Sequence, residues 1–270
     1  MISMLLCSAL LLSTAGFMFQ KDKPSTVLSW SIGNELQQLM DTYQRPLSIN
    51  RIFQYVYPHE YIDGKLASHI QAMNENDISV YAMDGGHHWG TTEDGFEEMT
   101  DFVDQVVEFN NAQDTDNVIK GIVFDVEPAQ DERFENNEQA IMKEFVDKMI
   151  QAYDYASNKG LRVVVCVTYW YDENHSAELR RLIKDGTDEV AVMNYYRNKE
   201  IEHIENEVAM AKEYNKPIIS IFEFDKADNE GIFDQNTYHD LGPEAAQTVF
   251  KKMDKHFRYE GLTPGWHQLR

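Results

Sequence analysis

The chain alternates short apolar runs with longer stretches in which apolar residues recur every three to four positions. Runs rich in β-branched residues predict eight strands, at Thr26–Ser31, Ile49–Tyr57, Ser79–Asp84, Ile119–Glu127, Arg162–Tyr169, Glu189–Tyr195, Pro217–Phe224 and Leu262–Gln268. The segments Phe96–Phe109, Glu138–Ser157 and Ile201–Tyr214 between them have the periodicity of amphipathic helices. This alternation is typical of repeated βα units around a parallel sheet.

Eight such units predict an α/β fold, a single closed (β/α)8 barrel (TIM barrel) over residues 20–270. The length of 270 residues fits, because single barrels commonly have about 250 residues. An open doubly wound sheet competes with this prediction, but the segment WSIGNE after the first run is not a Gly-rich phosphate turn. The sequence stops at Arg270, directly after the eighth run, so we expect the last helix to be missing. Either the N-terminal segment covers that gap or the barrel is slightly open.

Composition and charge narrow the classes of partner. Hydrophobic residues make up 43% and charged residues 26%, a balance that provides a sizeable apolar core. The 46 acidic residues outnumber the 24 basic ones, giving a net charge of −22 that repels phosphate backbones and anionic membranes. We therefore expect no nucleic-acid partner, whereas a neutral or amine-bearing glycan is compatible. The acidity is equally explained as a means of keeping an exported protein soluble.

The first residues have a pattern of their own. Residues 3–19 are apolar and end in small residues, as in a signal peptide, although the usual basic region before them is missing. An uncleaved N-terminal anchor is the alternative, and no other stable membrane insertion is expected. We predict a secreted or cell-surface protein. Removal of residues 1–19 leaves Cys166 as the one cysteine, which excludes an intramolecular disulfide and a cysteine-based metal site.

The predicted strand ends share a polar and aromatic character, and in such barrels the active site lies at the C-terminal ends of the strands. The substrate-binding candidates are Trp30, Tyr55, Asp84, His87, Trp89, Tyr169, Trp170, Asn194, Tyr196, Arg197 and Trp266. All four Trp residues fall at this rim. Because aromatic rings stack on sugar faces and carboxylates bind hydroxyl groups, the rim predicts a carbohydrate-binding cleft.

Two acids end the fourth run. The two-residue period of a strand puts Asp125 and Glu127 on one face and Val126 on the other. Two carboxyls so close do not ionise independently, so the pKa of one should rise into the range of a general acid. We expect Glu127 to protonate a leaving oxygen and Asp125 to hold or relay the proton. One of the two acids is alternatively a structural partner of Arg162 or Lys120.

Three strand ends carry motifs of a known family. Lys120–Glu127 reads KGIVFDVE, Met83–Gly86 reads MDGG and Met193–Tyr196 reads MNYY. In this order they resemble the D-G-x-D-x-D-x-E, S-x-G-G and M-x-Y-D motifs of the family 18 glycoside hydrolases, the chitinases and endo-N-acetylglucosaminidases. Trp266 stands where that family has the Trp that forms the floor of its cleft. The resemblance spans residues 20–270, through short motifs, and implies a barrel glycosidase without a cofactor.

The resemblance also assigns roles. It implies that Glu127 is the general acid and base, that Asp125 orients an acetamido group of the substrate, and that Tyr195 donates a hydrogen bond to that group. Two positions depart from the family: Val123 replaces its inner Asp and Tyr196 replaces the Asp of M-x-Y-D. Both departures should alter the pKa of Asp125, and they favour an alternative function, a chitinase-like barrel that binds glycans without cleaving them.

Two further alternatives follow from the residues themselves. Glu223 ends the seventh run and is a candidate nucleophile in a two-carboxylate mechanism, in which its separation from Glu127 decides between retention and inversion. His87 and His88 together with the two acids suggest a metal-dependent barrel hydrolase. The first run lacks the H-x-H signature of such enzymes, so no metal ligand is assigned. Cys166 is expected to be a small core residue.

Overall fold

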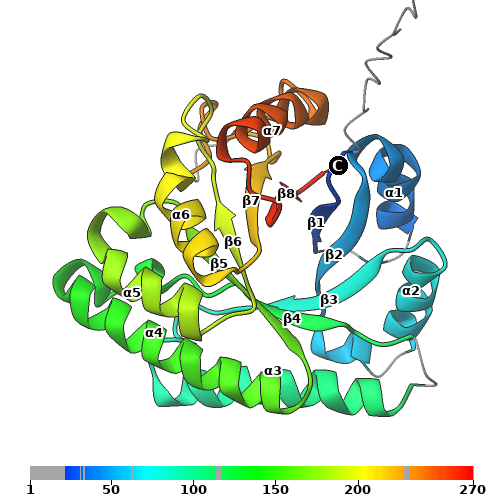
Figure 1. Ribbon diagram of the computed structural model, residues 1–270. Coiled ribbons are helices and arrows are strands. Elements are labelled where there is room, and N and C mark those ends of the chain that lie inside the picture. The colour runs from blue at the N-terminus through cyan, green and yellow to red at the C-terminus, as the bar shows by residue number, and fades with distance from the viewer. Residues whose placement is uncertain are drawn as a thin grey trace, which may run out of the picture.

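The computed structural model describes residues 22–30, 32, 34–61, 64–113, 117–227 and 231–269. The predicted signal peptide or anchor, residues 1–19, lies outside the described residues. The eight strands are β1 Ser25–Ser29, β2 Ile49–Tyr55, β3 Ser79–Asp84, β4 Gly121–Phe124, β5 Arg162–Thr168, β6 Glu189–Met193, β7 Ile218–Glu223 and β8 Leu262–His267. They form one closed parallel barrel in chain order (Figure 1), which confirms the predicted (β/α)8 fold. The barrel closes where β1 pairs with β8, through Thr26 with Gly265 and Val27 with Trp266, so it is not open.

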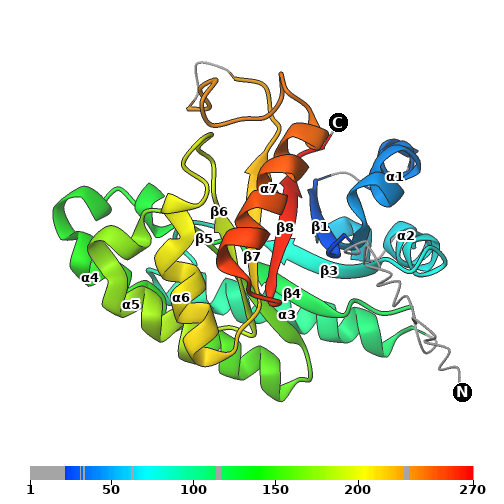
Figure 2. The same cartoon turned by 45° about the horizontal axis from the view of Figure 1, so that its top comes forward.

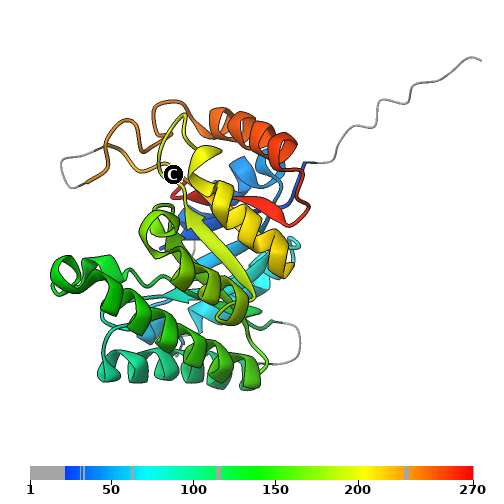
Figure 3. The same cartoon turned by 60° about the vertical axis from the view of Figure 1, so that its left-hand side comes forward.

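Helices surround this barrel on the outside. In the described part of the chain the α-helices are α1 Asn34–Leu47, α2 Lys65–Asn74, α3 Glu93–Asn111, α4 Phe134–Asn158, α5 Tyr171–Asp185, α6 Glu205–Tyr214 and α7 Pro243–Phe257. Short 3-10 helices lie at Pro58–Tyr61, Pro128–Gln130 and Glu202–Ile204. Figure 3 shows the helices running beside the strands, and the segment between β7 and α7 projects beyond the strand ends (Figures 2 and 3). Among the described residues, no helix has both the length and the apolar character needed to cross a membrane.

Helix α3 illustrates how the sequence fixes a helix and its buried face. The Thr92 hydroxyl accepts a hydrogen bond from the Gly95 backbone N–H at 2.9 Å, which caps the first turn. Glu93 and Asp94 follow in that turn, where negative charge favours the helix dipole. The buried side chains recur every three to four positions: Met99, Phe102, Val103, Val106 and Phe109. This apolar stripe holds the helix against the barrel.

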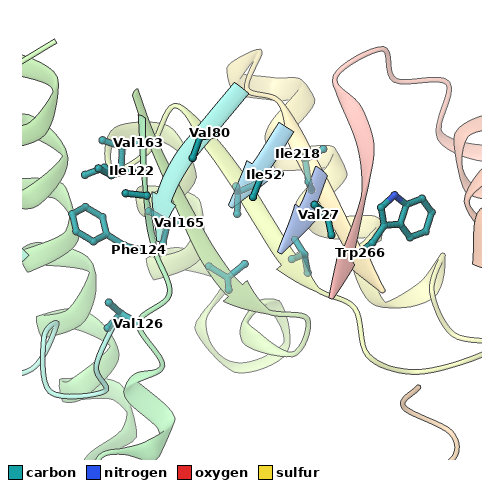
Figure 4. Packing of buried hydrophobic residues seen from close by; sticks show 14 of the residues in the cluster. Val27, Ile52, Val80, Ile122, Phe124, Val126, Val163, Val165, Ile218 and Trp266 are labelled. Atoms are coloured by element: carbon teal, nitrogen blue, oxygen red, sulfur yellow. The ribbon is translucent and has the colours of Figure 1, made fainter. Parts of the chain in front are cut away.

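The strands bury both faces, which gives two clusters of apolar side chains. The outer cluster fills the layer between strands and helices, and Figure 4 shows part of it, including Phe124 and Trp266 turned outward from β4 and β8. The inner cluster fills the barrel and consists of Leu28, Phe53, Tyr81, Met83, Val123, Val164, Cys166, Ala191, Ile219 and Ile221. This double burial explains why the strands are nearly continuous apolar runs in the sequence.

A buried ion pair crosses the barrel below the inner cluster. Arg51 on β2 donates from Nη1 and Nη2 to the two carboxyl oxygens of Glu189 on β6, at 2.6 and 2.8 Å. The Arg51 Nε donates to Thr26 Oγ1 at 2.9 Å. Because β2 and β6 are four strands apart in a ring of eight, the pair joins opposite walls of the barrel.

Several residues pack around β8, where the barrel closes. The Trp266 indole is fully buried and packs against Phe222 and Phe224, with ring centroids 5.5 and 6.1 Å apart. Lys23 Nζ donates to the carbonyl oxygens of Tyr259 and Leu262 and pairs with Asp254, which ties the described N-terminal end to α7 and β8. A cavity of about 670 Å³ remains between these residues and α7.

Candidate active site

Strand β4 aims its two acids into the barrel mouth. Val123 belongs to the inner cluster, whereas Phe124 and Val126 belong to the outer one (Figure 4). The two-residue period therefore places Asp125 and Glu127 on the inner face, as the sequence predicts. Gly85 at the end of β3 permits this arrangement, since a Cβ at that position would lie 2.0 Å from the Asp125 carbonyl oxygen.

A cavity of about 210 Å³ lies at this end of the barrel and contains both acids. Its lining, among the residues that the structure describes, is Leu28, Trp30, Asp125, Glu127, Cys166, Met193, Tyr195 and His267. The structure thus brings together four of the residues predicted from the sequence: Trp30, Asp125, Glu127 and Tyr195. These four come from β1, β4 and β6 or the residues directly after them.

Glu127 has the environment of a proton donor. It is half-buried, and its Oε1 accepts a hydrogen bond from Gln130 Nε2 at 2.9 Å. Burial and the negative charge of Asp125 raise the pKa of Glu127 above its ordinary value, against smaller opposing effects of Gln130 and His267. A raised pKa keeps a carboxyl protonated closer to neutral pH, where it can serve as a general acid.

Asp125 lies deeper than Glu127. Its Oδ1 is buried and has no hydrogen-bond partner among the residues that the structure describes. Burial raises the pKa of Asp125, while a positive charge on His267, present when its imidazole is protonated, and a hydrogen bond with the Cys166 thiol act in the opposite direction. Burial and the neighbouring Asp125 in turn raise the pKa of Cys166. Val123 occupies the position below, so the second carboxyl that the family motif has there is missing.

Aromatic rings form the wall opposite β4. His267 stacks against Tyr195, with centroids 5.9 Å apart and an angle of 17° between the rings. The Trp30 ring meets His267 edge-on at 4.8 Å. Burial raises the pKa of the Tyr195 hydroxyl well above its ordinary value, so this hydroxyl keeps its proton and can donate a hydrogen bond. The wall therefore offers ring surfaces and one hydrogen-bond donor to a ligand.

The carboxyl group of Glu223 is already engaged within the protein. Glu223 is 2% exposed and does not line the cavity. Its Oε1 accepts hydrogen bonds from the backbone N–H groups of Phe224 and Asp225, at 2.7 and 2.6 Å. Its Oε2 lies 2.6 Å from Nδ1 of His267. With both oxygens engaged in this way, Glu223 is not placed as a nucleophile.

Three predicted binding residues lie on the rim above β2 and β3. Tyr55 packs edge-on against Tyr57, whose side chain is exposed, with centroids 4.9 Å apart. Burial and the nearby charge of Asp84 raise the pKa of Tyr55. Asp84 accepts a hydrogen bond from the Gly85 N–H at 2.7 Å, and His87 is exposed. These residues line the approach to the mouth and not the 210 Å³ cavity itself.

Three other predicted binding residues face away from the mouth. Trp266 points into the outer layer and is fully buried, so it does not form the floor of a cleft. Trp89 is also buried in the outer layer, and its Nε1 donates to Glu98 at 2.8 Å. Asn194 is buried and donates to the Glu200 carbonyl oxygen and to Ser220 Oγ. The prediction that Trp89 and Trp266 bind substrate is therefore wrong, because both indoles are buried in the outer layer.

The remaining predicted residues gather beyond β5 and β6. Tyr169 stacks on His203 with centroids 4.1 Å apart, and Tyr196 meets the same imidazole edge-on at 5.5 Å. Trp170 packs against Tyr171 at 4.8 Å. The Arg197 side chain pairs with Asp240 at 2.9 Å. These partly buried side chains form the rim outside the cavity lining.

The candidate metal ligands among the described residues are largely engaged in hydrogen bonds with the protein. Within the described residues, Glu223, Asp225 and His267 place one possible ligand atom each within 4.8 Å of one another. The hydrogen bonds of Glu223 with His267 and two backbone N–H groups already use those carboxyl oxygens and the His267 Nδ1. His87 and His88 are not in this group, and His88 pairs with Glu98.

Sequence reasoning did not select Leu28, Cys166, Met193 or His267 as site residues, although all four line the cavity. The signal for His267 was present in the alternation along β8. Leu262, Pro264 and Trp266 carry the apolar bulk, so the residues between them belong to the inner face. His267 is the last of these inner positions and reaches the mouth.

Comparison with known proteins gives a fold relationship. No protein-family profile matches the sequence, and no curated protein matches it. A chitinase from Bacteroides thetaiotaomicron matches in structure with a TM-score of 0.56 and 11% identity, over 91% of this chain and 90% of that one.

Two other solved structures are similar to the same extent. Ega3 of Aspergillus fumigatus, in complex with galactosamine, has a TM-score of 0.54 and 11% identity, over 92% of this chain and 91% of that one. A xylose isomerase domain protein from Planctomyces limnophilus has a TM-score of 0.57 and 12% identity, over 92% and 89%. At these identities the likeness shows the fold. In fold, the chain is similar to the glycoside-hydrolase barrels that its sequence motifs resemble.

Proposed function

We propose that this barrel hydrolyses glycosidic bonds of an extracellular polysaccharide or amino-sugar glycan, with Glu127 as the proton donor. The observation that carries the proposal is the pairing of Asp125 and Glu127 in one cavity at the C-terminal ends of the strands. Burial and the charge of Asp125 raise the pKa of Glu127, as a general acid requires. The rings of Trp30 and Tyr195 are suited to stacking on a sugar.

The net charge of −22 favours neutral or amine-bearing glycans over anionic ones. The fold likeness to a chitinase and to a protein that was solved with galactosamine supports including amino-sugar polymers among the substrates tested. Secretion is part of the proposal and is motivated by the apolar residues 3–19.

A second candidate function is glycan binding without cleavage. It is favoured by Val123, because this fully buried apolar residue lies where the family motif has the Asp that shares a proton with its neighbour. In that case the aromatic mouth retains a ligand and Glu127 only binds a hydroxyl group.

Substitution of Glu127 by Gln distinguishes the two candidates. We expect wild-type protein to release reducing ends from at least one member of a panel of neutral and amino-sugar polysaccharides. Glu127→Gln should lower kcat by about 10²- to 10⁴-fold while the dissociation constant for the glycan changes little. The matched control is Glu132→Gln, an exposed acid in the same connection between β4 and α4. Wild-type protein that binds a glycan but releases no reducing ends refutes hydrolysis and supports the binding function.

A further inference from the structure

The Glu223 and His267 side chains form a hydrogen-bonded pair behind the cavity wall. Glu223 Oε2 and His267 Nδ1 are 2.6 Å apart, and the pair has little solvent exposure, with 2% for the Glu223 side chain and 16% for the His267 side chain. The two residues are also partners across the strand register, since Glu223 on β7 lies beside His267 on β8. This pair is absent from the function proposed above, which uses only β4 and the aromatic wall.

The hydrogen bonds of Glu223 determine which imidazole nitrogen carries the proton. An ionised carboxylate is only an acceptor, and Glu223 Oε1 already accepts from two backbone N–H groups. The Nδ1 of His267 is then the donor to Oε2, which leaves the lone pair of a neutral imidazole on Nε2. Tyr195 on one side and Trp30 on the other fix the ring in the cavity wall.

Strand order places this imidazole across the mouth from Glu127. Strands β4 and β8 are four apart in a closed ring of eight, so they are opposite walls of the barrel. Glu127 and His267 both line the same cavity. An inverting glycosidase needs this arrangement, with an acid on one side of the sugar and a base on the other, and room for a water between.

The other groups at the mouth are less suited to act as the base. Both oxygens of Glu223 are engaged in hydrogen bonds. Asp125 is the deeper of the two acids, and burial disfavours its charged form by raising its pKa. Burial likewise raises the pKa of the Tyr195 hydroxyl. His267 Nε2 remains as a group with an available lone pair in the cavity that Glu127 also lines.

We propose that His267 is the catalytic base that activates the attacking water, and that Glu223 is the positioning residue that holds its imidazole. The proposal rests on the glycosidase function above. Water transfers one proton to Nε2 while its oxygen bonds to the anomeric carbon. The bond from that carbon to the leaving oxygen breaks, and the proton of Glu127 moves to this oxygen. The product therefore has the inverted anomeric configuration.

Substitution of His267 tests the base and separates it from a structural role. We expect His267→Ala to lower kcat by about 10²- to 10⁴-fold with little change in KM, and added imidazole to restore part of the rate. Glu223→Gln should also lower kcat, because an amide cannot accept all three hydrogen bonds that the carboxylate accepts, and here imidazole should give no rescue. His256→Ala, an exposed histidine on α7, is the matched control and should keep the wild-type rate. Thermal unfolding and glycan binding of each variant establish that it is folded.

The anomer that forms first, observed by proton NMR during hydrolysis, gives the second test. Inversion is expected, and retention overturns the role of His267 as base for water. If His267→Ala hydrolyses glycan at the wild-type rate, that role is also overturned, whereas the proposed function stands. If the wild-type protein hydrolyses no glycan, or if Glu127→Gln keeps full activity, the proposed function itself fails and the base role fails with it.

Discussion

The free energy of unfolding should fall as the pH rises, because α6 carries a buried acid. Glu207 is fully buried, and within the described part of the chain its carboxyl has no hydrogen-bond partner apart from its own backbone N–H. Burial, with a smaller effect of the charge on Asp172, raises the pKa of Glu207 from 4.5 to about 9. Between these two values the unfolded chain has lost this proton while the folded chain keeps it, so folding is opposed increasingly as the pH rises.

The size of the effect follows from the pKa difference. Each pH unit above 4.5 lowers the free energy of unfolding by about 1.4 kcal/mol, which amounts to about 3 kcal/mol at pH 7 and about 6 kcal/mol at pH 9. Glu207→Gln removes this titration. Burying an amide with few partners costs about 1–3 kcal/mol at every pH. The free energy of unfolding of the variant therefore increases relative to that of the wild type as the pH increases.

Urea unfolding of wild type and Glu207→Gln at pH 5, 6, 7 and 8 measures this directly. The stability difference should change in favour of the variant by about 1.4 kcal/mol per pH unit, because the other titrating groups cancel between the two proteins. Glu205→Gln changes an exposed acid of the same helix and should give a difference that is constant with pH. A constant difference for Glu207→Gln as well refutes the argument that burial keeps this carboxyl protonated.

Two further predictions concern the barrel. Arg51→Met leaves Glu189 buried without its partner and should cost about 3–5 kcal/mol of unfolding free energy, whereas a double variant with Glu189→Met should cost less than the sum of the single variants. Chemical unfolding of the four proteins measures the coupling, and additive costs contradict it. Trp266→Ala should lower the free energy of unfolding by about 3–5 kcal/mol, since the fully buried indole packs against Phe222 and Phe224. The control is Tyr57→Ala, whose side chain is 45% exposed and whose loss should lower Tm less. If thermal unfolding shows the same decrease in Tm for both variants, the argument from burial of the indole is refuted.

The fold was predictable because its signals are redundant along the chain. Each of the eight predicted strands has an observed counterpart, and β3 has the predicted bounds Ser79–Asp84. Parallel strands covered by helices require apolar runs, and the lack of a Gly-rich phosphate turn after the first run favoured a closed barrel over an open doubly wound sheet. The sequence did not reveal that the Trp266 indole is fully buried in the outer layer.

The site was harder to predict because it depends on which way each side chain points. From Phe124 to Glu127, apolar outer residues alternate with acidic inner residues, so Asp125 and Glu127 were assigned to the inner face correctly. At β8 the aromatic Trp266 was predicted to bind substrate, and its neighbour His267 was not. Trp266 pairs with Val27 and lies in the outer layer, so the residue after it must face inward.

The same alternation of outer apolar and inner polar side chains occurs at the ends of β4 and β8. Strand residues that support the helices must be large and apolar, and at the mouth the alternate positions are free to be polar because they face solvent or ligand. Glu127, three residues after β4, and His267, the last residue of β8, are inner residues at the mouth ends of these two opposite strands. Val126 and Trp266, one residue earlier, are their outer neighbours and belong to the core. The same physical requirement that buries Trp266 therefore presents His267 to the cavity, opposite the acid that the sequence identified.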